Sequence, residues 1–334
     1  RGALTAAASA LVPEVAPLAS AAEITDAVDA LVGLGPVERL LRDPEVTDVL
    51  VNGPSDVWVE RRGSLERSEL TFADDRAIVA AVERVIAPLG LRIDRASPAV
   101  DARLADGSRL HAVIPPASVD GPIVAVRRFS ETVTDLEALV QRGGISRRGA
   151  ELLRAAVSDR LNVLVAGGTG AGKTTLLNVL SKEINAAERT VTVEDAAELR
   201  LEGHVVRLEA RPPNPEGAGE ITVRALLRHA LRLRPDRIVV GEVRGPEALD
   251  MIQAMSTGHE GSMSTIHANG PEEALWRLES LAATADSGAS TDTLRRQIHS
   301  AIDRVVFVAR RPEARVVASI CEVGADGVEE IYSC

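Results

Sequence analysis

The chain has 334 residues, enough for two domains of ordinary size, and a formal net charge of -11 at pH 7. The negative charge argues against an extended nucleic-acid groove, because phosphate backbones favour positive surfaces. Two cysteines are too few for a disulfide framework, and no apolar run approaches the ~18 to 20 residues that span a bilayer. A disulfide scaffold and an integral membrane protein are therefore excluded, and a cytoplasmic location is favoured.

The first part of the chain predicts a small α+β domain. Residues 1–34 form an expected N-terminal tail with a helix from about 22 to 32, and the small domain should occupy residues 35–130. A helix is expected near residues 78–86. The Asp-Gly pair at 106–107 predicts a hairpin that joins strands 100–104 and 109–114. Residues 131–146 contain Gly143-Gly144 and are expected to be a linker.

The second part, residues 147–334, alternates strands with helices. This pattern predicts an α/β fold with a mostly parallel sheet that is covered on both faces. Apolar runs give the strands, and helical spacing of apolar residues gives the helices. The expected strands are 161–165, 190–195, 237–242, 304–309 and 315–322, and the expected helices are 146–157, 175–180, 222–234, 245–256, 271–284 and 291–301.

A phosphate-binding loop organises this second part. Its pattern is G-x-x-x-x-G-K-[ST], between a predicted strand and a predicted helix. Glycines let successive backbone N–H groups turn toward one anion, and the helix adds its positive end. Lys173 is expected to reach the β- and γ-phosphates of ATP, and the Thr174 hydroxyl to bind Mg²⁺. The expected nucleotide-binding residues are Gly167, Gly168, Thr169, Gly170, Ala171, Gly172, Lys173, Thr174 and Thr175.

Carboxylates follow two further apolar strands. Glu194 and Glu242 should reach the same edge of the sheet as Gly167, where open α/β sheets bind ligands. There a carboxylate can hold Mg²⁺, directly or through water, or orient the attacking water. The alternative is surface charge at the entrance of a loop.

Two histidines and several arginines each allow two roles. His259 and His267 are candidates for contact with the γ-phosphate, and the alternative is a hydrogen-bonded structural role. Arg224, Arg228 and Arg232 form a stripe that is either solvated or meets a neighbouring subunit. Arginines at the strands of the small domain are usually structural, although one supplied across an interface can stabilise a transferring phosphoryl group.

Four motifs in order resemble the traffic ATPases of secretion systems. They are the phosphate loop, Glu194–Leu199, Arg234–Gly245 and Thr257–Asn269. Within that superfamily the chain is most similar to the TadA/CpaF branch of tight-adherence (Flp) pilus ATPases. The small-domain stretches 51–60 and 101–116 also match this branch, so the resemblance covers about residues 37 to 334.

The resemblance implies a RecA-like ATPase core that uses ATP and Mg²⁺. It identifies Glu194 as the catalytic carboxylate, Glu242 as the Walker B carboxylate near Mg²⁺, and His259 and His267 as the histidine box. Arg109 and Arg127 match positions from which related motors reach the γ-phosphate. Family members form hexameric rings with nucleotide between their two domains, against a platform protein at the cytoplasmic face of the inner membrane. No direct contact with nucleic acid is expected.

We therefore expect an ATP-hydrolysing hexameric motor that powers pilus assembly or protein secretion. The first alternative is a nucleic-acid translocase or partitioning ATPase on a similar core, which the net charge and the few aromatic residues disfavour. The second is a scaffold without enzymatic activity, which the intact Lys173, Thr174, Glu194 and Glu242 disfavour.

Overall fold

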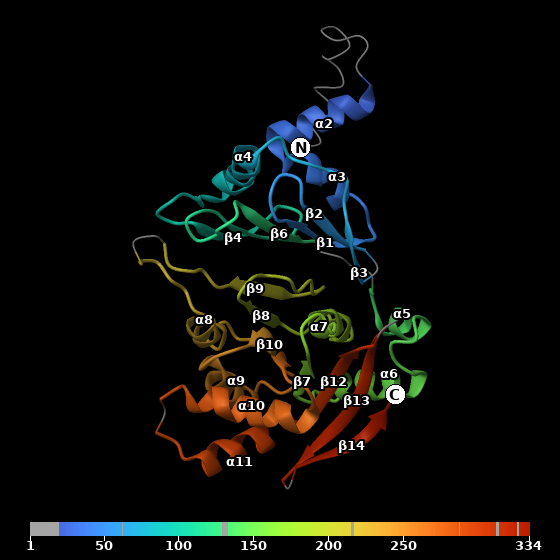
Figure 1. Cartoon of the computed structure of the whole chain (residues 1–334). Helices are drawn as coiled ribbons and strands as arrows, with labels where there is room; N and C mark the ends of the chain where they lie inside the picture. Colours follow the sequence, from blue (N-terminus) through green and yellow to red (C-terminus); the bar gives the residue numbers. More distant parts are fainter. Residues whose placement is uncertain are drawn as a thin grey trace. The chain divides into compact units, whose positions relative to one another are not determined.

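The computed structural model describes residues 20–61, 63–128, 133–214, 217–286, 288–311, 314–325 and 327–334. The chain divides into two compact units, one up to Ser130 and one from Glu131 onward. Each unit has its own sheet (Figure 1). The buried aliphatic residues also separate into cores that belong to one unit or the other.

The first unit contains a six-stranded antiparallel sheet with the order β3-β2-β1-β6-β5-β4. Its strands are β1 (Val46–Val51), β2 (Val57–Arg61), β3 (Ser64–Arg67), β4 (Ala99–Arg103), β5 (Arg109–Val113) and β6 (Ile123–Arg127). Its helices are α2 (Ala21–Val32), η1 (Gly35–Val37), α3 (Glu38–Leu41), α4 (Asp75–Ile86) and η2 (Ala87–Leu89).

Helix α2 is part of this unit rather than of a free tail. Ser20 and Glu23 cap its start reciprocally, which satisfies two backbone donors of the first turn. Ile24 and Val28 are buried. The buried carboxylate of Asp29 pairs with the Arg42 guanidinium, so charge pairing adds to the apolar contact.

The second unit contains an eight-stranded sheet with the order β14-β13-β12-β7-β11-β10-β8-β9. Strands β7 to β12 are parallel, and β13 and β14 extend the sheet antiparallel. The strands are β7 (Val163–Gly167), β8 (Thr190–Glu194), β9 (Val205–Glu209), β10 (Arg237–Val243), β11 (Met263–His267), β12 (Arg304–Arg310), β13 (Arg315–Gly324) and β14 (Gly327–Ser333).

Helices cover both faces of this sheet, as the alternating sequence pattern predicted (Figure 1). They are α5 (Leu136–Gln141), α6 (Arg147–Ser158), α7 (Lys173–Ser181), α8 (Val223–Ala230), α9 (Glu247–Met255), α10 (Pro271–Ala283) and α11 (Thr291–Ala301). Side chains of α8 to α11 share one core with the sheet, and those of α5 to α7 share the other. The predicted α/β fold class is therefore confirmed.

The structure differs from the sequence prediction in several elements. Strands β1, β9 and β14 were not predicted. The described part of the expected linker packs in the second unit, because Leu136 of α5 and Ile145 after it are both buried in a core of that unit. The backbone carbonyl of Gly144 also accepts a hydrogen bond from the Val317 N–H of β13. Among the residues that the structure describes, no helix is both long enough and apolar enough to cross a membrane.

Candidate nucleotide-binding site

The phosphate loop joins the end of β7 to the start of α7. Gly172 has φ +102°, a left-handed conformation that side chains rarely adopt, and it caps α7. Gly167 is required for a different reason, because a Cβ there would lie 2.5 Å from the Val308 carbonyl oxygen of β12. The loop therefore closes tightly against β12 and leads into the amino-terminal end of α7, where a helix favours an anion.

Lys173 folds back over this loop. Its Nζ donates to the carbonyl oxygens of Gly167 and Gly168, both at 3.1 Å, and lies 3.2 Å from Nε2 of His267. The side chain is buried, with 7% of its surface exposed. The ammonium group is thus fixed at the mouth of the loop, where a phosphate would meet it.

A β-bulge directs Glu242 toward the same point. Between Val240 and Val243, strand β10 has one residue more than the facing segment of β11. Thr265 donates its hydroxyl to the Gly241 carbonyl at 2.7 Å and stabilises this irregularity. Oε1 of Glu242 then lies 3.0 Å from Nε2 of His267 and 3.9 Å from Nζ of Lys173. Oε1 thus faces the Lys173 ammonium and the His267 ring, and it has no hydrogen-bond partner among the described residues.

His267, at the end of β11, completes this cluster. It lies between a cation and an anion, since Lys173 and Glu242 both face its Nε2. Burial lowers the pKa of His267, and the charge of Lys173 lowers it further, while Glu242 acts in the opposite direction. The neutral imidazole is therefore favoured.

Glu194 lies one strand beyond Glu242, because β8 follows β10 in the sheet. Its Oε1 accepts the N–H groups of Glu198 and Leu199, both at 2.8 Å, whereas Oε2 is buried without a hydrogen-bond partner among the described residues. Burial raises the pKa of Glu194 to about 7, against the opposing effect of these two hydrogen bonds. A carboxylate with that pKa can accept a proton near neutral pH.

The shape of β10 makes room for this carboxylate. A Cβ at Gly241 would lie 2.9 Å from Cγ of Glu194, which is closer than real Cβ atoms come. Gly241 and Glu194 are neighbours because Val240 pairs with Val193 in the ladder. One glycine thus sits both in the bulge that aims Glu242 and against the side chain of Glu194.

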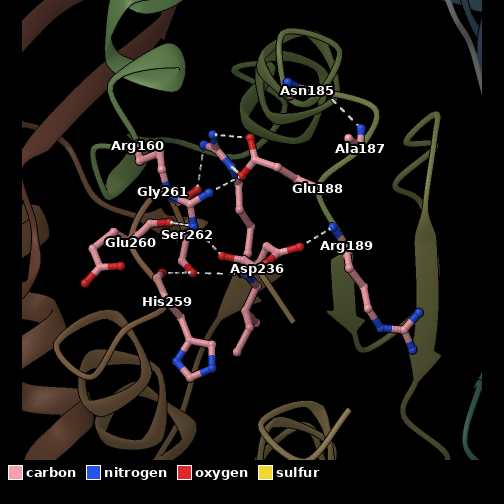
Figure 2. A network of polar contacts seen from close by, with 12 residues as sticks. Arg160, Asn185, Ala187, Glu188, Arg189, Asp236, His259, Glu260, Gly261 and Ser262 are labelled. Atoms are coloured by element: carbon pink, nitrogen blue, oxygen red, sulfur yellow. Dashed lines mark hydrogen bonds and ion pairs between the residues drawn. The ribbon is translucent and has the colours of Figure 1, made fainter. Parts of the chain in front are cut away.

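The structure places His259 away from the cluster of Lys173, Glu242 and His267. His259 precedes β11 and His267 ends it, so the five-residue strand, ~13 Å long, separates the two. His259 therefore lies before the start of β11, near Ser262 and Asp236 (Figure 2), and its carbonyl oxygen accepts the Ser262 hydroxyl at 2.6 Å. Its Nδ1 lies 3.3 Å from the Ala254 carbonyl oxygen, which is a structural contact.

The amino-terminal edge is held by buried polar groups (Figure 2). Arg237 is 1% exposed and binds both oxygens of Glu188, at 2.8 and 3.0 Å, and Glu188 also pairs with Arg160. Nearby, the buried amide of Asn162 donates to the carbonyl oxygens of Met255 and Ala301 and accepts the Ser262 N–H. These contacts join the starts of the strands to the ends of α9 and α11.

The predicted arginines belong to both units. Arg109 and Arg127 are opposite each other on β5 and β6 of the first unit. In the second unit, Arg224 and Arg228 of α8 bind the two oxygens of Asp250 on α9, at 2.7 and 2.9 Å. That part of the arginine stripe therefore joins two helices.

Four residues near the site were not predicted. The Arg244 side chain binds Glu242, and the Glu247 carboxylate accepts the backbone N–H of Arg244. Arg310 and Arg315, paired across β12 and β13, lie within 3.7 Å and 3.4 Å of the Cβ positions that Gly170 and Gly172 lack. The spacing of Glu242 and Arg244, two residues apart at a strand end, is a signal that the sequence did offer.

The assembled groups fit a polyphosphate and a hard cation. Loop N–H groups and the Lys173 ammonium suit phosphate oxygens. Oxygen donors are what Mg²⁺ prefers, and Oε1 of Glu242 is a buried carboxylate oxygen without a hydrogen-bond partner in the described part of the chain. The described residues contain no cluster of three or more histidine, cysteine or acidic side chains of the kind that holds a metal without a substrate.

Known proteins are similar to this chain in sequence. The family model described as "Type II/IV secretion system protein" matches residues 30–326. A Mycobacterium tuberculosis protein described as "Putative conjugal transfer protein" is 45% identical over 287 residues, covering 84% of this chain and 81% of its own. The type IV secretion system protein PtlH of Bordetella pertussis is 37% identical over 296 residues, covering 80% and 86%.

Solved structures share the fold. The Legionella pneumophila ATPase DotB gives a TM-score of 0.62 at 19% identity, over 87% of this chain and 80% of that one. The pilus retraction motor PilT, solved with bound ADP, gives 0.59 at 18% identity, over 85% and 80%. The family match over nearly the whole chain decides the assignment: the chain belongs to the type II/IV secretion system protein family.

Proposed function

We propose that the chain is a Mg²⁺-dependent ATPase that drives a secretion or pilus machine. The observation that carries the proposal is the convergence of Lys173, Glu242 and His267 at the mouth of the phosphate loop. A cation, a carboxylate and a neutral imidazole from three elements meet there. Phosphoryl transfer needs this combination of positioning and charge stabilisation.

Each residue has a proposed role. The loop from Gly167 to Thr175 binds the phosphates, and Thr174 and Glu242 hold Mg²⁺, Glu242 directly or through water. Mg²⁺ would neutralise charge on the phosphate oxygens. Glu194 accepts the proton of the attacking water, since its pKa of about 7 suits that task. His267 contacts the γ-phosphate.

The assembly is also a proposal. We infer a homo-hexamer at the cytoplasmic face of the inner membrane, against a platform protein, with Arg109 and Arg127 of the first unit supplying positive charge to the nucleotide. The TadA/CpaF branch is proposed from the small-domain stretches 51–60 and 101–116. The proposed domains are a small domain up to residue 130, which includes helix α2, and an ATPase core from about residue 131, which includes α5.

A labelling experiment tests nucleotide binding directly. The chain has two lysines, Lys173 and Lys182. An amine-reactive reagent with mass spectrometry therefore reports on both in one sample. ATP should protect Lys173 and leave Lys182, whose Nζ lies 3.6 Å from an oxygen of the exposed Glu202, as reactive as before. Equal protection of both lysines, or of neither, would contradict the assigned site.

The two lysines also provide an activity test. Lys173→Ala should lower phosphate release ~10²- to 10³-fold, because a charge-stabilising group is lost. Lys182→Ala is the matched control and should keep the wild-type rate. Because one relative is described as a conjugal transfer protein, the assay should be repeated with DNA. Salt-sensitive stimulation of turnover by DNA would favour the nucleic-acid translocase instead.

A further inference from the structure

Glu242 is held by an arginine from the end of its own strand. Arg244 follows Glu242 by two residues, which places both side chains on the same side of the chain. Its Nε donates to Oε2 of Glu242 at 2.6 Å, and its second terminal nitrogen forms a further contact with the same oxygen. The two oxygens of Glu242 are thus divided: Oε2 faces Arg244, and Oε1 faces His267 and Lys173.

The backbone of Arg244 is fixed independently. Oε1 of Glu247 accepts the N–H groups of Arg244 and Gly245, both at 2.7 Å. Glu247 is itself buried, with 8% of its surface exposed, and it starts helix α9. The turn after β10 therefore cannot move freely away from Glu242.

Arg244 also reaches the neighbouring strand end. Its Nη1 lies 3.9 Å from Oδ2 of Asp195, the residue that follows Glu194. One guanidinium group thus lies between the ends of β10 and β8. Arginine suits such a bridge because its planar fork can serve two carboxylates at once.

The charges explain what this arrangement would do. Without nucleotide, Lys173 and Arg244 both face the Glu242 carboxylate. When a phosphate binds the Lys173 ammonium, Arg244 is the cation that still contacts Glu242, by a short hydrogen bond. A carboxylate without it could turn either oxygen toward the phosphates.

We propose that Arg244 is a positioning residue that holds Oε2 of Glu242 and thereby keeps Oε1 turned toward the nucleotide. This role rests on the proposed ATPase function. Arg244 acts through Glu242 rather than on the nucleotide, so its loss should slow the chemical step more than it weakens binding.

The experiment compares three variants with the wild type. Steady-state turnover gives kcat and KM for ATP, and a fluorescent ATP analogue with Mg²⁺ gives Kd. Arg244→Gln removes the charge, and Arg244→Lys keeps it without the fork. Arg295→Gln is the matched control, since Arg295 is an arginine of similar exposure, 54% against 60%, that pairs with Glu279 on the helices α10 and α11. Arg244 is largely exposed, so each variant should fold, which far-ultraviolet circular dichroism checks.

We expect Arg244→Gln to lower kcat about 10- to 100-fold with Kd changed less than about 3-fold, because misplacing a reacting group costs rate. Arg244→Lys should recover part of kcat, and Arg295→Gln should match the wild type. A kcat within about 2-fold of wild type in Arg244→Gln would overturn this role alone, as would an equal loss of kcat and affinity. A wild type that neither binds nor hydrolyses ATP would instead overturn the proposed function, and this role with it.

Discussion

The buried carboxylate of Glu194 should make the protein less stable as the pH rises toward neutrality. In the folded chain burial raises its pKa to about 7 from an ordinary value of 4.5. The folded state therefore binds a proton that the unfolded state has already lost between these two values. A group with a raised pKa contributes its stability below the unfolded pKa and loses it as the pH rises through the folded pKa.

The magnitude follows from the two pKa values. Each pKa unit corresponds to about 1.4 kcal/mol, so this carboxylate should withdraw roughly 3 kcal/mol from the free energy of unfolding between about pH 4.5 and 7. Glu194→Gln cannot ionise, and its amide oxygen can still accept the N–H groups of Glu198 and Leu199. Its buried amide nitrogen imposes a cost of about 1 to 3 kcal/mol, but that cost does not depend on pH.

The assay is urea denaturation of wild type and Glu194→Gln at several pH values from 4.5 to 8.5. The difference in unfolding free energy between the two proteins should shift by about 3 kcal/mol in favour of the variant as the pH rises. All other titrating groups are common to both proteins, so they cancel in this difference. Parallel curves would refute the reasoning, since they would mean that Glu194 titrates alike in the folded and unfolded states.

Three further perturbations have expected outcomes. Asn162→Ala should lower the free energy of unfolding by about 2 to 4 kcal/mol, measured by urea denaturation, because it leaves buried backbone groups without partners; a change below about 0.5 kcal/mol would contradict this. Gly241→Ala should displace Glu194 and reduce kcat more than nucleotide affinity in a phosphate-release assay; a structure with an unmoved carboxylate would count against it. Glu188→Gln should cost about 3 kcal/mol because it leaves the buried Arg237 without its carboxylate. Hydrogen bonding to Arg237 holds the pKa of Glu188 below its ordinary value. The contribution of Glu188 to the free energy of unfolding is therefore present above pH 4.5 and is lost as the pH falls through the lowered pKa. A difference between wild type and variant that persists at low pH would argue for another cause.

The sequence pattern was enough to predict the central strands of the second unit, but not its edge strands or strand β1 of the first unit. The strand before Gly167 is a continuous aliphatic run, and the helix after it has clear spacing, so both could be recognised. Strand β9 is half-exposed at the edge of the sheet, and its short run Val205-Val206-Arg207-Leu208 lacks strict alternation. Strand β1, although central, was hidden by a similarly irregular pattern with a bulge near Thr47.

For the site, the sequence indicated which residue types matter but not which edge they reach. His259 and His267 are eight residues apart in one motif, and only the placement of β11 between them shows that they lie at opposite edges. The bulge in β10 could not be predicted either, because it depends on the pairing with β11. The spacing of Glu242 and Arg244 is visible in the sequence, but their contact depends on the turn that Glu247 holds in place.

Because β10 has an extra residue, deleting one residue there would disturb the site more than substituting one. Successive side chains of an extended strand alternate in direction, so deleting Gly241 would shift Glu242 and Val243 by one position each. An acidic group would then point into the aliphatic layer, and a valine would face the loop. Nucleotide chemistry at this edge would thus depend on how many residues the strand contains as well as on which ones they are.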